Sequence, residues 1–105
     1  MAKAPFSLTA KPTFKCKVDI PIPGDKPATV EFIFKGRTRE QFKAFIESLV
    51  DREDADVILD LASGWDLEDS FDLENIELLI QNYLGAAKAI IEKYLSELTA
   101  ARTKN

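Results

Sequence analysis

The sequence contains no histidine, and cysteine and tryptophan occur only once each among its 105 residues. Without histidine, the chain lacks the commonest general base and metal ligand of enzymes. Its four glycines are isolated along the chain, so a glycine-rich phosphate-binding loop is missing too. Cys16 lies in a strand-like pattern, which favours a small core residue over a nucleophile. We therefore expect a protein without enzymatic activity, cofactor or metal ion.

Long hydrophobic stretches are also missing. Runs such as residues 57–59 fall far short of the roughly 20 apolar residues that a membrane span requires. The first five residues lack the apolar stretch of a secretory signal. A single cysteine cannot form an internal disulfide bond, which fits a reducing cytoplasm. The length and composition predict one ordered domain with a single core.

The charges are unevenly distributed along the chain. Residues 1–50 hold nine of the fourteen basic residues and five acids, whereas residues 51–77 hold eleven of the eighteen acids and one base. The remaining residues are weakly basic. This asymmetry suggests self-association or a charged partner.

Two stretches alternate between apolar and polar residues, which is typical of half-buried strands. They cover residues 14–20 and 30–35, and the proline-rich segment 21–27 between them predicts a loop. Together they predict an antiparallel hairpin. Because an isolated hairpin is marginally stable, we expect either helices or a second copy of the chain to cover it.

Helical spacing of apolar residues follows Gly36. Thr38 and Gln41 have the form of a capping box, Ser63-Gly64 predicts a helix end, and Asp72 is a suitable N-cap. The predicted helices cover residues 39–51, 55–62, 73–83 and 86–101. Strands followed by helices predict an α+β fold with an N-terminal β-hairpin and about four helices packed on one face of it. The last two helices, closely joined, should pack as a helical hairpin.

The predicted domain covers residues 13–102. Residues 1–12 should form a flexible N-terminal arm able to add an edge strand, and residues 103–105 should fray. Residues 63–71 should form an acidic loop. In this loop Trp65 either anchors the segment on the helices or forms, with Phe71, an aromatic contact site rimmed by acids.

Two other interpretations of the charged segments are less well supported. Oxygen-bearing residues from Asp66 to Glu77 follow the spacing of an EF-hand, but Phe71 occupies the position that needs glycine. An acidic loop before a capped helix is the simpler interpretation. Lysines and arginines along the hairpin could face nucleic acid, but the aromatic residues beside them lie on the predicted core face, and RNA-binding sheets need exposed aromatics.

Three sets of residues within about the last forty positions form a recognisable pattern. The first two are Gly64-Trp65-Asp66 and the stretch from Phe71 to Ile76 with Leu79. The third, at the end of the chain, consists of Asn82-Tyr83, Gly85-Ala86-Ala87, Ile90, Tyr94-Leu95, Leu98, Ala101-Arg102 and Lys104-Asn105. This pattern resembles a family of phage tail assembly chaperones. Leu84 stands where the family is expected to have a proline.

The resemblance implies a protein of long-tailed bacteriophages or prophages that works in the host cytoplasm and is absent from the mature virion. Such a protein binds the tape-measure protein, keeps it soluble and helps to recruit the tail-tube protein, in many phages with a frameshifted longer form. It is expected to form a homo-oligomer and to bind neither nucleic acid nor membrane. The expected partner-binding residues are Trp65, Phe71, Ile80, Tyr83 and Tyr94.

Two alternatives remain open at this point. The protein could be a structural minor tail or connector protein that is retained in the virion. It could also be a small regulatory module that uses the acidic loop to mimic a charged ligand.

Overall fold

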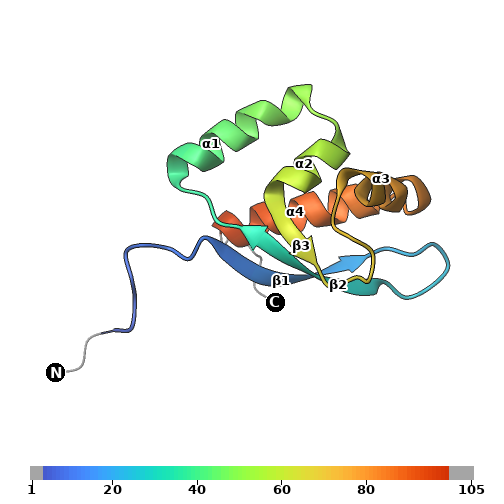
Figure 1. The fold of residues 1–105 in the computed structure, drawn as a ribbon, viewed down its shortest axis with the longest axis horizontal. Coiled ribbons are helices and arrows are strands. Elements are labelled where there is room, and N and C mark those ends of the chain that lie inside the picture. Colours follow the sequence, from blue (N-terminus) through green and yellow to red (C-terminus); the bar gives the residue numbers. More distant parts are fainter. Residues whose placement is uncertain (1–3, 100–105) are drawn as a thin grey trace.

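The computed structural model, which describes residues 4–99, has the predicted α+β fold (Figure 1). Its sheet has the strand order β1-β2-β3, and both pairings are antiparallel. The strands are β1 (Thr13–Ile20), β2 (Ala28–Lys35) and β3 (Ala62–Trp65). The helices are α1 (Arg39–Ser48), the single 3-10 turn η1 (Leu49–Asp51), α2 (Asp54–Leu61), α3 (Leu73–Asn82) and α4 (Ala86–Thr99).

The predicted hairpin is confirmed as β1 and β2. Its register places Val18 opposite Val30 on the buried face and Lys17 opposite Glu31 on the other face. Opposite charges at such cross-strand positions favour this register over a slip by one residue. In the connecting loop Gly24 has a φ of 77°, a conformation that glycine adopts without steric cost.

The third strand, β3, corrects the prediction for residues 63–71. These residues were expected to form a loop after a helix end at Ser63-Gly64, but α2 ends at Leu61 and the chain passes directly into β3. In the sheet Trp65 pairs with Phe32, and a bulge follows at Ile33/Phe34. The long-range pairing with the free edge of β2 decides the conformation, because four residues have too little periodicity of their own to predict a strand.

The predicted helix starts are confirmed in atomic detail. In the capping box the Gln41 backbone N–H donates to Thr38 Oγ1 at 3.1 Å, and the Thr38 N–H donates to Gln41 Oε1 at 2.9 Å. Before α3, Asp72 Oδ1 accepts a hydrogen bond from the Asn75 N–H at 2.9 Å. These bonds satisfy backbone donors that the first turn of a helix leaves unpaired.

The core lies between one face of the sheet and the helices. Phe32 and Phe34 of β2 are completely buried, as are Ile58 of α2 and Ile90 of α4. The opposite face of the sheet carries exposed side chains such as Lys15 and Lys17. The helices therefore cover a single face, as the alternation of apolar and polar residues predicted.

The arrangement of α3 differs from the predicted helical hairpin. Figure 1 shows α3 nearly end-on while α4 runs across the view, so the two helices cross steeply, and α3 packs mainly beside α2. The junction is constrained because a Cβ atom on Gly85 would lie 3.2 Å from Pro21 Cγ in the β1–β2 loop. The chain turns between α3 and α4 at this close approach.

The described part of the N-terminal arm, residues 4–12, is exposed and projects away from the domain (Figure 1). It does not form the edge strand considered from the sequence. One backbone hydrogen bond, from the Gly36 N–H to the Pro12 carbonyl at 2.8 Å, joins its base to the end of β2. The expected fraying of residues 103–105 concerns positions outside the described residues.

Among the described helices, none has the length and apolar character of a bilayer span.

Candidate functional site

A surface groove lies between the segment that follows β3 and helix α3. We call it the Trp65 groove; its volume is about 230 Å³. It is lined by Trp65, Leu67, Asp69, Asn75, Leu78, Leu79, Asn82 and Tyr83. Its apolar lining is more extensive than its polar lining, so it is suited to apolar side chains.

Trp65 both anchors the loop and lines the groove. Its indole Nε1–H donates a hydrogen bond to the Asp69 carbonyl at 2.7 Å, which closes residues 65–69 into a compact turn. Its ring makes edge-to-face contacts with Phe71, at a centroid distance of 5.1 Å, and with Phe32, at 5.9 Å. The anchoring and contact-site interpretations of Trp65 are thus compatible, since the half-buried ring keeps an exposed part beside the groove.

The chain segment beside the groove is acidic. Asp69 lines the groove, and Asp66, Glu68, Asp72 and Glu74 are exposed along the same segment from β3 to α3. The chain has no lysine or arginine between Arg52 and Lys88. An apolar groove beside a segment of one charge sign favours a partner that presents apolar side chains flanked by basic ones.

Exposed apolar residues extend the groove across the surface of α3. Leu78 is 58% exposed and Leu84 is 87% exposed, whereas Leu67 and Tyr83 are exposed to 39% and 36%. Clusters of exposed apolar residues of this kind commonly mark interaction sites. Leu67 and Leu78 were not among the residues expected from the sequence. Helical spacing does not distinguish an exposed leucine such as Leu78 from a buried one, and Leu67 lies in a loop without periodicity.

The five expected partner-binding residues lie in three places. Trp65 and Tyr83 line the groove, and Phe71 supports it by packing against the Trp65 ring. Ile80 lines a separate, mostly polar depression of about 480 Å³ between α3 and the start of α2. Tyr94 is completely buried, so in this conformation its side chain offers no surface to a partner.

Tyr94 instead belongs to a hydrogen-bonded cluster below α1. Its hydroxyl donates to the Lys35 carbonyl at 2.8 Å and accepts from Arg37 Nε at 2.7 Å. The Arg37 guanidinium lies 4.3 Å from the centroid of the Phe45 ring, a cation–π contact with the only buried residue of α1. Burial raises the pKa of Tyr94 in spite of the nearby arginine, which keeps the phenol protonated as a donor.

Asp60 completes this cluster by pairing with two arginines. Its carboxylate lies 2.9 Å from Arg52 Nη1 and 3.4 Å from Arg37 Nη2. Partial burial acts to raise the pKa of Asp60, but the hydrogen bonds and charges of Arg52 and Arg37 outweigh it and hold the pKa below its ordinary value. The cluster joins α1, α2, α4 and the end of β2, which indicates a structural role.

The alternative chemistries that the sequence supported less well can also be compared with the structure. Among residues 4–99, no three carboxylate or thiol side chains come together in a way that could hold a metal ion. Asp72, one of the EF-hand positions, caps α3 instead. Phe32 and Phe34 are buried in the core and therefore unavailable for stacking on bases. Cys16 is half-buried, and its thiol donates to the Lys17 carbonyl at 3.7 Å.

The fold and the groove define a small α+β protein with a cluster of exposed apolar residues on and beside α3. The family model of phage tail assembly chaperones matches residues 1–105, the whole chain. The chain therefore belongs to the phage tail assembly chaperone family. Proteins of a chaperone family are generally not enzymes, and membership implies that the chain binds phage tail proteins. Neither the curated proteins nor the solved structures include a match to this chain.

Proposed function

We propose that this protein binds the tape-measure protein of a long-tailed phage through the Trp65 groove and keeps it soluble until the tail tube encloses it. The observation that carries the proposal is the apolar groove between the Trp65 loop and α3, in a chain of the tail assembly chaperone family. A long helical client exposes apolar stripes before assembly, and an apolar groove is a common means of covering such a stripe.

The size of the groove indicates how the client is held. A volume of about 230 Å³ accommodates one or two apolar side chains and not a whole helix. Each copy therefore contributes a weak contact, and several copies along one client give useful affinity together. The acidic segment beside the groove adds attraction for basic residues that flank the client's apolar stripe.

A pull-down with the tape-measure protein tests the location of the site. The variant Leu78→Ser removes an apolar side chain from the groove, and we expect it to weaken capture at least tenfold. The double variant Trp65→Ala, Phe71→Ala should weaken capture further. Val50→Ser is the matched control, because Val50 is 84% exposed and belongs to η1. Unchanged capture by the Leu78→Ser and double variants would reject this site.

The remaining parts of the proposal concern the course of tail assembly. The protein acts without catalysis in the host cytoplasm, helps to recruit the tail-tube protein, by itself or as a frameshifted longer form, and leaves before the tail is complete. Mass spectrometry of purified virions tests this course. The chain should be absent from mature particles, whereas a structural tail component would be present in a fixed ratio to the tail-tube protein.

A further inference from the structure

The N-terminal arm carries two large apolar side chains that contact almost nothing in the domain. Phe6 is 79% exposed and Leu8 is 96% exposed. They are flanked by Lys3 and Lys11, and residues 1–12 contain no acid. An exposed segment of this composition is suited to an apolar surface with an acidic rim.

The Trp65 groove has these complementary properties. Its lining is mainly apolar and includes Asp69, and the segment from β3 to α3 that contributes this lining carries further exposed carboxylates. The basic, apolar arm and the acidic, apolar groove are thus matched in charge and in hydrophobicity within one sequence.

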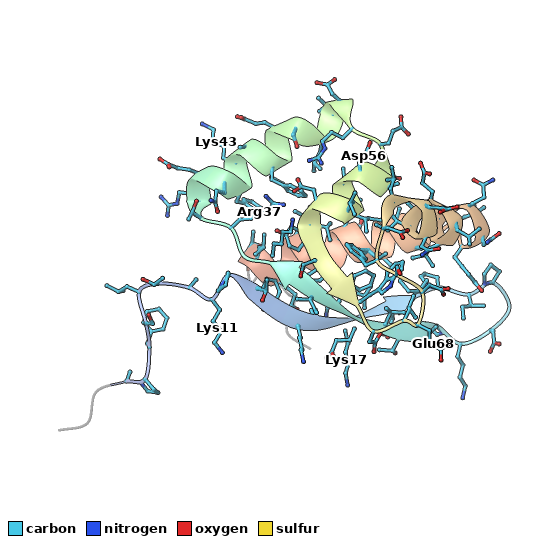
Figure 2. The ribbon with its side chains drawn as sticks, in the orientation of Figure 1. Lys11, Lys17, Arg37, Lys43, Asp56 and Glu68 are labelled. Atoms are coloured by element: carbon cyan, nitrogen blue, oxygen red, sulfur yellow. The ribbon has the colours of Figure 1, made fainter. Side chains whose placement is uncertain are left out.

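The arm is directed away from the groove of its own chain. The hydrogen bond from the Gly36 N–H to the Pro12 carbonyl fixes the base of the arm, and the Lys11 carbonyl lies where a Cβ atom on Gly36 would be only 2.9 Å away. From this base the arm extends outward, and Figure 2 shows Lys11 and Glu68 on opposite sides of the view. The groove that the arm can most readily reach therefore belongs to another molecule.

We propose that Phe6 and Leu8 of one copy occupy the Trp65 groove of a second copy, so that the arm holds two copies of this chain together. The contact concerns only this chain and does not depend on the identity of the client. It covers the apolar groove while no client is bound, and a client that uses the same groove displaces the arm.

Sedimentation velocity over a concentration series tests the contact on the full chain. The arm variant Phe6→Ser, Leu8→Ser and the groove variant Leu67→Ser, Leu78→Ser should each weaken self-association at least tenfold. Val50→Ser should leave it unchanged. The arm variant alters side chains outside the core, so its result stands even if the groove variant proves unstable.

Mixing the two variants identifies the surfaces that meet. The groove variant keeps an intact arm, and the arm variant keeps an intact groove that can receive it. The mixture should therefore associate more strongly than either variant alone. Trp65, the only tryptophan, reports occupation of the groove through its fluorescence. Its emission should change with concentration in the wild type and not in the arm variant.

Three results would overturn the proposal: a wild-type chain that is monomeric throughout, an arm variant that associates like the wild type, or a mixture that does not associate. None of them bears on client binding, which the arm variant should retain in the tape-measure pull-down. Failure of the arm contact and failure of the proposed function are therefore distinguishable.

Discussion

At the scale of single residues, Tyr94 shows how one polar group is accommodated in an apolar core. Its ring is buried against Phe34 and Phe45, and its hydroxyl makes two hydrogen bonds. Replacing Tyr94 by phenylalanine should lower the free energy of unfolding by about 1–3 kcal/mol, because Arg37 and the Lys35 carbonyl lose their partner. Urea denaturation measures this change. Tyr83→Phe, at the surface, should change stability by less than about 0.5 kcal/mol.

Asp60 makes the stability of the fold depend on pH. Its pKa in the folded state is lowered, so the ionised carboxylate stabilises the fold above the ordinary pKa, and this contribution is lost as the pH falls through the lowered value. Asp60→Asn should therefore reduce stability at neutral pH and flatten its decline below about pH 4. Thermal melts from neutral to acidic pH measure both effects. Asp56→Asn, exposed on the same helix, should keep the wild-type profile.

At the scale of elements, the end of β2 and the short strand β3 respond differently to the same substitution. Gly36→Ala places a Cβ atom 2.9 Å from the Lys11 carbonyl oxygen, which should displace the arm base and cost about 1 kcal/mol. Gly64→Ala places it 3.5 Å from Ile33 Cδ1, an ordinary contact. It should raise stability by up to about 1 kcal/mol by restricting the unfolded chain. Chemical denaturation measures both changes. If Gly36→Ala and Gly64→Ala changed the free energy of unfolding equally, the different contacts inferred for the two positions would be contradicted.

The elements that the sequence predicts well are those with local signals. The hairpin follows from alternation, and α1 and α3 follow from their caps at Thr38 and Asp72. Strand β3 could not be predicted in this way, because Ala62 to Trp65 form a strand only through pairing with β2, which is distant in the sequence. The steep crossing of α3 and α4 likewise has no local pattern, and the turn between them lies where Gly85 packs closely against Pro21, which is distant in the sequence.

The candidate site was predictable only in part for a similar reason. Its aromatic character was visible at Trp65 and Phe71, since such residues in an acidic segment are unusual. The contribution of Leu78 was not visible, because its exposure depends on how α3 rotates against α2. Tyr94 was assigned to the surface because periodicity gives the apolar face of a helix but not the element that covers it.

At the scale of the whole molecule, stability should be unevenly distributed. Phe45 is the only buried residue of α1, whereas four residues of α4 are buried, Ala86, Ala87, Ile90 and Tyr94. Elements with few buried contacts open at lower free energy. Native-state hydrogen exchange should therefore show the amides of α1 exchanging well before those of α4. Similar protection of both helices would show that the cluster around Arg37 holds α1 as firmly as the core holds α4.

The outward direction of the arm, away from its own groove, also bears on how many copies can join. If each arm reaches the next copy along a common direction, every added molecule leaves one unused arm and one unused groove at the two ends of the row. Such a series has no intrinsic stopping point, unlike a symmetric pair in which both contacts close on each other. The length of the row would then depend on the concentration of the protein, and the row would shorten as a client takes the grooves and displaces the arms.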